Sequence, residues 1–228
     1  MKDEFLVLQR NPWFASQPPR LRNALLERSR VSRIETGRWI YGTGDALNGL
    51  YGVLEGSVQL LMTPGDGEPR LLDIAPAGQL FGQASRFGGG PRLVTAIAGE
   101  PTLLLHVPDY ALAEVARSEP TIWRNFTALL YAQLAGALQL VTLLIHLPPP
   151  KRVAARLALL TLTGDAISLT QSQLAELCGL SRKTVNGHLK RLAEEKIIAV
   201  NYHSVTILNR AKLIARSGGV LAAMNQAL

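Results

Sequence analysis

The stretch from Leu169 to Ile198, LTQSQLAELCGLSRKTVNGHLKRLAEEKII, constrains the fold more than any other part of the chain. Thr170 is a suitable N-cap for a short helix, because Gln173 three residues later can complete a capping box. Gly179 ends that helix, since glycine adopts the left-handed conformation of a sharp turn at little cost. Ser181 can then cap a second helix. The pattern predicts a helix-turn-helix.

The second helix of this pair has two distinct faces. Val185, Leu189 and Leu192 recur at intervals of four and three residues, which gives the helix one face to pack. The opposite face is polar and basic, and such a face suits the major groove of B-DNA, where Arg and Lys read guanine and Asn reads adenine. The alternative is an ordinary amphipathic hairpin whose basic face is only solvated. We predict base reading by Arg182, Lys183 and Asn186, and phosphate contacts by Ser181, Thr184, Lys190 and His203, the last in the hairpin turn of VNYHSV.

Charge is partitioned unevenly along the chain. Residues 1–150 carry 13 Lys and Arg against 13 Asp and Glu, whereas residues 151–228 carry 11 against 4. The whole net charge of +7 therefore belongs to the C-terminal third, which implies a polyanionic partner for that part. Double-stranded DNA is the predicted partner.

Composition excludes several classes of protein. With 228 residues, 47% hydrophobic and 18% charged, the chain can bury a core and fits two small domains. The single cysteine, Cys178, excludes an internal disulfide framework and is expected to be a small buried residue. The N-terminus shows no signal-peptide pattern, so we expect a cytoplasmic protein. The four histidines lack metal-ligand spacing and catalytic motifs are absent, so we expect no enzyme activity, no metal and no cofactor.

The N-terminal half changes character near residue 36. Residues 6–35 are predicted to be helical and irregular, whereas residues 37–108 contain short β-branched and aromatic runs separated by turn residues about every ten positions. This spacing predicts an antiparallel roll or barrel. The Asp66-Gly67 pair in PGDGEP predicts a hairpin turn. Further corners are expected at Gly44, Gly56, Gly78 and Gly82.

One long helix is predicted from residue 120 to 147, where Pro148, Pro149 and Pro150 end it. No charged residue occurs from Asn125 to Pro150, and about 20 apolar residues suffice to cross a bilayer. Polar residues interrupt the segment and no basic asymmetry flanks it, so we predict no membrane partner. We expect instead a homodimer, in which Gly136 allows two helices to approach closely. The predicted seam consists of Phe126, Leu130, Leu134, Ala137, Val141 and Leu144.

Several segments resemble transcription regulators of the cyclic AMP receptor protein and fumarate-nitrate reduction regulator (Crp-Fnr) family. Residues 41–60, YGTGDALNGLYGVLEGSVQL, resemble its β-roll, and residues 78–98, GQLFGQASRFGGGPRLVTAIA, resemble its phosphate-binding cassette. The helix-turn-helix and the preceding PPPKRVAARLALL also match the family pattern. The resemblance implies an α+β fold: an antiparallel β-roll (jelly roll) sensor domain over 1–119, a dimerisation helix over 120–147 and a winged helix-turn-helix over 148–228.

The effector site implied by the resemblance departs from the nucleotide-binding members. Those members hold the ribose with a glutamate and the cyclic phosphate with an Arg-Ser pair, whereas the positions here read Gln83, Arg92 and Leu93. We therefore predict that cyclic AMP is not the main effector, although Arg92 and the glycine-rich RFGGGPR still offer groups that bind phosphate. The effector contacts implied by the resemblance are Gly82, Gln83, Arg92, Leu93 and Thr142.

The sequence thus predicts a cytoplasmic, dimeric, sequence-specific DNA-binding transcription regulator that recognises a pseudo-palindromic operator under the control of an unidentified effector. RNA polymerase is a further partner that such a regulator can have. Lys183 and Gly187 replace the glutamate and the second arginine of the best-known members, so their operator sequence is not transferred. Two alternatives stay open: a small-molecule-binding module whose helix-turn-helix serves assembly, and a membrane-tethered sensor.

Overall fold

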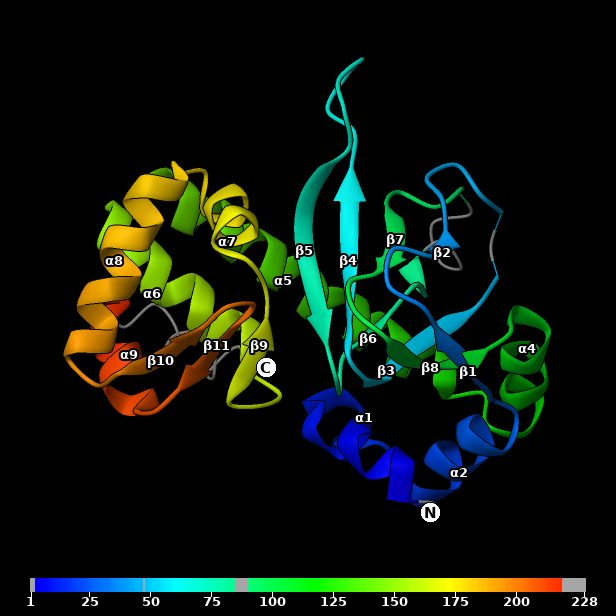
Figure 1. Cartoon of the computed structure of the whole chain (residues 1–228). Helices are drawn as coiled ribbons and strands as arrows, with labels where there is room; N and C mark the ends of the chain where they lie inside the picture. Colours follow the sequence, from blue (N-terminus) through cyan, green and yellow to red (C-terminus); the bar gives the residue numbers. More distant parts are fainter. Residues whose placement is uncertain (1–2, 47, 85–89, 219–228) are drawn as a thin grey trace. The chain divides into compact units, whose positions relative to one another are not determined.

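The computed structural model describes residues 3–46, 48–84 and 90–218, and the chain divides into two compact units (Figure 1). The units comprise Met1–Tyr131 and Ala132–Leu228. Their boundary falls inside the long helix α5 (Ile122–His146), so each unit contains part of that helix. We describe each unit by itself.

The first unit is built on two antiparallel four-stranded sheets. The first sheet has the order β1-β8-β3-β6 and the second the order β2-β7-β4-β5. This arrangement confirms the predicted antiparallel roll. The strands are β1 (Arg30–Ile34), β2 (Trp39–Tyr41), β3 (Leu50–Glu55), β4 (Ser57–Met62), β5 (Arg70–Pro76), β6 (Leu80–Phe81), β7 (Thr95–Ala98) and β8 (Thr102–Val107).

Strand β1 corrects the sequence prediction, which placed residues 30–34 in a helical and irregular region. Its five residues, RVSRI, are exposed or half-buried and show little apolar alternation. The strand forms because its backbone pairs with β8 along its whole length, from Arg30 opposite His106 to Ile34 opposite Thr102. A strand that is held at a sheet edge by backbone pairing need not show an alternating apolar pattern in its sequence.

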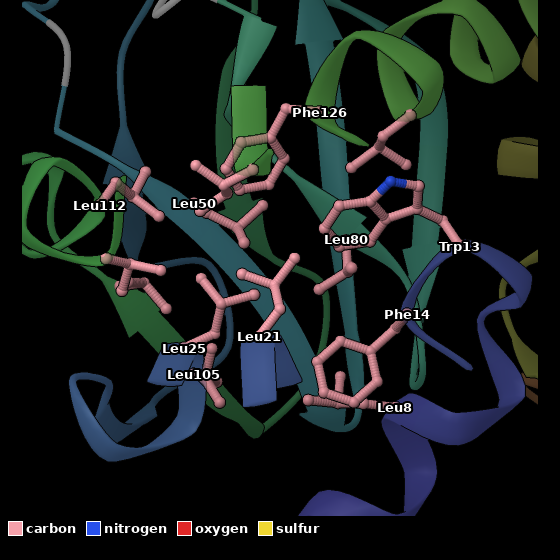
Figure 2. Close-up of a cluster of buried hydrophobic side chains, with 14 of the residues drawn as sticks. Leu8, Trp13, Phe14, Leu21, Leu25, Leu50, Leu80, Leu105, Leu112 and Phe126 are labelled. Carbon is pink, nitrogen blue, oxygen red and sulfur yellow. The ribbon is translucent and has the colours of Figure 1, made fainter. Parts of the chain in front are cut away.

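Short helices and the start of α5 cover the main core of this unit (Figure 2). Trp13 stacks on Phe126 with ring centroids 5.2 Å apart, and its Nε1 donates a hydrogen bond to the carbonyl of Asn125. Phe126 is therefore a core residue, which corrects its predicted place in the dimer seam. The helical segments are η1 (Asp3–Arg10), α1 (Pro12–Ser16), α2 (Pro19–Glu27) and α4 (Asp109–Ser118).

The turns of the roll depend on glycine where the sequence indicated corners. Gly56, between β3 and β4, has a φ of +75°, and a Cβ there would lie 2.6 Å from the carbonyl oxygen of Pro101. Only glycine fits this turn without strain. At the tip of the β4–β5 hairpin, the Gly67 amide donates to the Pro64 carbonyl at 3.1 Å. This confirms the predicted hairpin turn.

The second unit contains the end of α5 and a winged helix fold. Three strands form a sheet in the order β10-β11-β9, and α6 supplies the central buried helix with Val153, Ala154 and Leu157. Pro149 and Pro150 lie in the first turn of α6, where a missing N–H costs nothing. The elements are α6 (Pro149–Leu160), β9 (Ala166–Ser168), α7 (Gln171–Cys178), α8 (Arg182–Glu194), β10 (Ile198–Asn201), β11 (Ser204–Ile207) and α9 (Arg210–Arg216).

Helix α5 exposes a regular stripe of large apolar side chains, which we call the α5 seam. Its members are spaced by three and four residues, the spacing of a helix that packs along another helix. By length and composition α5 is also the one helix of the described residues that could cross a bilayer. Leu134 and Val141 belong to both the predicted seam and the α5 seam, and the predicted Ala137 and Leu144 are also exposed, whereas Leu130 is half-buried. The α5 seam consists of Tyr131, Leu134, Leu138, Val141 and Ile145.

Candidate nucleic-acid interface

The first helix of the helix-turn-helix, α7, begins as the sequence predicts. The Thr170 hydroxyl accepts a hydrogen bond from the Gln173 amide at 3.1 Å, and the Gln173 side-chain oxygen accepts one from the Thr170 amide at 2.7 Å. This reciprocal capping box satisfies two amides that the helix leaves unpaired. Leu174 and Leu177 are buried, so α7 is fixed to the unit through its apolar face.

The turn between α7 and α8 closes the end of α7 with both backbone and side-chain donors. Gly179 has a φ of +60°, its amide donates to the Glu176 carbonyl at 3.1 Å, and the Leu180 amide donates to the Ala175 carbonyl at 2.9 Å. The Cys178 carbonyl oxygen accepts a hydrogen bond from Nη1 of Arg152 at 3.1 Å. These hydrogen bonds fix the residue at which α7 ends and the position from which α8 begins.

Helix α8 has the predicted N-cap, the predicted buried face and the predicted exposed face. The Ser181 hydroxyl accepts a hydrogen bond from the Thr184 amide at 3.1 Å, and the hydroxyls of Ser181 and Thr184 lie 2.8 Å apart. On one side Val185, Leu189 and Leu192 are buried. The opposite side is exposed, and we call it the recognition face. The recognition face consists of Arg182, Lys183, Asn186, Gly187 and Lys190.

Lys190 of the recognition face and His203, which lies outside α8, are the two remaining predicted phosphate contacts. Lys190 forms an exposed pair with Glu194 at 4.0 Å, a contact that contributes little and that a phosphate can replace. His203 is exposed in the turn between β10 and β11, which confirms the predicted hairpin. Its ring meets the ring of Tyr202 edge-on, with centroids 4.2 Å apart. This turn is the tip of the wing.

Sequence reasoning missed Arg152 and Tyr202. Arg152, on α6, donates to the Leu147 carbonyl just beyond α5 and to the Cys178 carbonyl at the end of α7. It joins two segments 31 residues apart in the sequence, and no local pattern signals such a contact. Tyr202 is 92% exposed at the tip of the wing, where an aromatic residue in a polar turn is a signal that was available.

Two titratable side chains of α7 and α8 have perturbed pKa values. Burial lowers the pKa of His188, and the nearby Arg191 lowers it further. Burial raises the pKa of the Cys178 thiol to about 12, which leaves it protonated. Cys178 is thus the small buried residue that the sequence predicted.

The predicted effector residues of the first unit centre on Arg92, which is only 3% exposed. Its guanidinium donates to the Gly82 carbonyl, the Asn48 side-chain oxygen and, at 3.2 Å, the Gly49 carbonyl. It also lies over the ring of Tyr41, 4.3 Å from the centroid. Burial lowers the pKa of Arg92, while Tyr41, Tyr51 and Asp45 raise it. The arginine that would hold a phosphate is engaged by acceptors of its own chain.

Asn48 connects this arginine to a neighbouring histidine. The Nε2 of His106 lies 2.6 Å from the Asn48 carbonyl oxygen, and its ring stacks on Tyr51 at a centroid distance of 4.4 Å. Burial lowers the pKa of His106, and Arg30 and Arg92 lower it further against the opposing hydrogen bond to Asn48. Burial also raises the pKa of Tyr41 to about 12. The surroundings of Arg92 are therefore buried and aromatic, with the carboxylate of Asp45 as a nearby opposite charge.

The remaining predicted effector residues differ from one another in burial and in position. Gln83 is buried, whereas Leu93 is 69% exposed. Thr142 belongs to the second unit, and its hydroxyl donates to the Leu138 carbonyl at 3.0 Å. The glycine-rich segment RFGGGPR lies mostly outside the described residues, from Arg86 to Gly89. Within the described ranges, no three His, Cys, Asp or Glu side chains gather to hold a metal ion.

Comparison with known proteins matches each of the two units to a known domain family. Residues 31–119 match the cyclic nucleotide-binding domain, and residues 151–216 match the Crp-like helix-turn-helix domain. The chain is 34% identical over 181 residues to the cyclic AMP receptor protein of Thermus thermophilus, covering 78% of this chain and 83% of that protein. It is 28% identical over 220 residues to a CRP-like cAMP-activated global transcriptional regulator of Mycobacterium tuberculosis, covering 92% and 98%.

Solved structures agree with this assignment. The catabolite activator protein of Thermus thermophilus is 30% identical, with a TM-score of 0.51 over 92% of this chain and 100% of that one. FixK2 from Bradyrhizobium japonicum shares the fold at 21% identity, with a TM-score of 0.69 over 82% of this chain and 96% of that one. The chain belongs to the Crp-Fnr family and is a DNA-binding transcription regulator of that type.

Proposed function

We propose that this regulator binds a pseudo-palindromic operator as a homodimer, with α8 of each protomer in the major groove. The observation that carries the proposal is the recognition face, which presents Arg182, Lys183, Asn186 and Lys190 to solvent while the other side of α8 is buried. An α-helix fits the major groove, and these side chains are the types that bind base edges and phosphates there. The positive charge of the C-terminal third supports the same partner.

The side chains of the recognition face divide between two tasks. Arg182 and Asn186 have the donors and acceptors that read guanine and adenine, and Lys183 lies next to Arg182 on the first turn. Ser181 and Thr184 lie at the N-terminus of α8, where amides and hydroxyls favour a phosphate. Lys190 and, from the wing, His203 are exposed, and we assign them phosphate contacts at the edges of the groove.

The α5 seam supports the dimer. Its five apolar side chains are all exposed in the single chain, and their spacing is that of knobs that insert into a second helix. A membrane span would not require this heptad spacing, because lipid contacts all sides of a helix alike. We therefore favour a soluble cytoplasmic dimer over a membrane-tethered sensor, and we include RNA polymerase among its partners.

The effector is proposed to be a small molecule other than cyclic AMP. Relatives named for cyclic AMP make that nucleotide the first ligand to test. In this chain the guanidinium of Arg92 already donates to Gly82, Asn48 and Gly49, so a phosphate would have to replace these contacts. Gln83 also lacks the charge with which a glutamate holds a ribose. Both features oppose tight binding of a cyclic nucleotide.

Three alanine variants test the DNA-binding proposal. Arg182→Ala and Asn186→Ala should each relax base preference at one position and cost about 1–3 kcal/mol at the selected operator. Lys190→Ala should weaken binding to all duplexes alike and reduce the salt dependence. Electrophoretic shift with operator and scrambled duplexes measures both effects. If all three variants lose affinity uniformly, the division between base and phosphate contacts is wrong. If the wild-type protein shifts neither duplex, the helix-turn-helix serves assembly only.

A further inference from the structure

The guanidinium of Arg92 is a buried cation that forms no ion pair with a carboxylate of the described residues. Its three acceptors are the Gly82 carbonyl, the Asn48 side-chain oxygen and the Gly49 carbonyl, and all three are neutral. The Asp45 carboxylate attracts the guanidinium from nearby but is not one of these acceptors. The Nε of Arg92 is also buried, and in the part of the chain that the structure describes it donates to no acceptor. Because buried cations in proteins are normally paired, this guanidinium retains a donor for an anion.

The backbone fixes two of the three acceptors. Gly49 has a φ of +121°, and a Cβ there would lie 2.1 Å from the carbonyl oxygen of Val107. Gly82 has a φ of +93°, and a Cβ there would lie 2.9 Å from a ring carbon of Tyr51. Both carbonyls therefore belong to tightly packed turns that favour glycine. Neither carbonyl can turn away from Arg92 without disrupting the roll.

Asn48 supplies the one acceptor of these three that can leave by rotation of a side chain. The residue is half-buried, and its backbone is held separately, because Nε2 of His106 lies 2.6 Å from its carbonyl oxygen. Rotation of the side chain would withdraw the amide oxygen from Nη2 of Arg92 and leave the backbone of residue 48 in place. The Nε and Nη2 groups of an arginine together form a fork that binds two oxygens of one oxyanion.

We propose that Asn48 is an internal substitute for an anionic effector. Its amide oxygen occupies Arg92 in the unliganded protein, and the oxyanion group of an effector binds by displacing it. An amide oxygen carries no net charge, so it bonds a guanidinium less strongly than a phosphate or carboxylate oxygen does. Asn48 therefore determines how tightly an anion must bind in order to enter the site. This inference rests on the proposed function, in which a small-molecule effector controls the regulator.

The test uses the full chain and compares cyclic AMP, which carries one phosphate, with adenosine, which carries none. Asn48→Ala removes the internal acceptor and keeps the carbonyl that His106 contacts, so it should bind cyclic AMP at least tenfold more tightly than the wild type does. Its affinity for adenosine should change less than twofold. Asn48→Asp should instead bind cyclic AMP at least tenfold more weakly than the wild type, because a carboxylate would pair with Arg92 and repel the phosphate. Titration calorimetry at millimolar ligand measures all of these affinities.

Two control variants separate release of Arg92 from a general effect of the substitution. Asn23→Ala makes the same change at an exposed position of α2 in the same unit, so both affinities should stay within twofold of the wild type. Adding Arg92→Ala to Asn48→Ala should abolish the gain for cyclic AMP.

Three results would overturn the inference. Cyclic AMP binding by Asn48→Ala within twofold of the wild type would do so and leave the proposed function intact. An equal gain for adenosine and cyclic AMP would also do so, because it would reflect looser packing instead of a released guanidinium. Micromolar binding of cyclic AMP by the wild type would overturn both this inference and the proposal that the effector is another molecule.

Discussion

Replacement of Arg152 by methionine is the perturbation whose effect follows most directly from the geometry. The Arg152 side chain donates Nε and Nη2 to the Leu147 carbonyl at 3.3 and 3.0 Å, and Nη1 to the Cys178 carbonyl at 3.1 Å. Methionine keeps much of the apolar stem and removes every donor. Two carbonyls, one beyond the end of α5 and one at the end of α7, then lose their charged partner.

The magnitude follows from the two acceptors. A hydrogen bond from a charged donor contributes about 1.5–3 kcal/mol, and Arg152 is half-buried, so water can partly replace it. We expect the free energy of local opening at the end of α7 to fall by about 2–4 kcal/mol for Arg152→Met. Since each 1.4 kcal/mol is a factor of ten, amide exchange there should accelerate by about 30-fold to several hundredfold.

Hydrogen exchange followed by mass spectrometry on the full chain measures this effect by segment. Peptides covering Gln171–Cys178 should exchange faster in Arg152→Met, and peptides from the first unit should not change. Arg182→Met is the matched control, because Arg182 is exposed and its side chain forms no hydrogen bond within the described residues, so surface replacement should change stability by about 0.5 kcal/mol or less. Equal exchange in the two variants would refute the structural role of Arg152.

Three further predictions concern the α5 seam, the first unit and the ligand of that unit. Leu138→Glu places a charge in the α5 seam, so sedimentation should show monomers and operator binding should weaken; an intact dimer would place the interface elsewhere. Burial lowers the pKa of His106 below its ordinary value of 6.5, so protonation opposes folding, and stability should decline as pH falls below 6.5. His106→Gln should flatten this decline in urea unfolding followed by the fluorescence of Trp13, Trp39 and Trp123, all of the first unit; an unchanged pH dependence would assign it to another group. Calorimetry with cyclic AMP should show no micromolar binding, and micromolar heats that vanish in Arg92→Ala would contradict the account.

Local signals made the helix-turn-helix predictable. Capping by Thr170 and Ser181, the left-handed turn at Gly179 and the buried face of α8 each depend on residues within one or two helical turns. Such patterns are visible in a sequence because the interacting groups are close together in it. The glycine corners of the roll were predictable for the same reason.

Contacts between distant residues explain what the sequence did not reveal. Strand β1 forms through backbone pairing with β8, some 70 residues later, and its own side chains show little alternation. Phe126 has the spacing of the α5 seam but packs on Trp13, more than a hundred residues earlier. The engagement of Arg92 by Asn48 likewise depends on closure of the roll. In each case the local sequence is compatible with more than one structural role, and contacts with distant residues determine which role the residue has.

Selection of random duplex DNA by the full-length protein, followed by sequencing of the bound fraction, tests the central claim most directly. The account predicts an enriched sequence with two inverted half-sites whose centres lie about one helical turn, roughly 10–10.5 base pairs, apart. Binding to this sequence should weaken steeply as salt rises, because basic side chains release counterions from the phosphates. Absence of enrichment, or equal affinity for one half-site and the full palindrome, would contradict a dimer that reads DNA with α8.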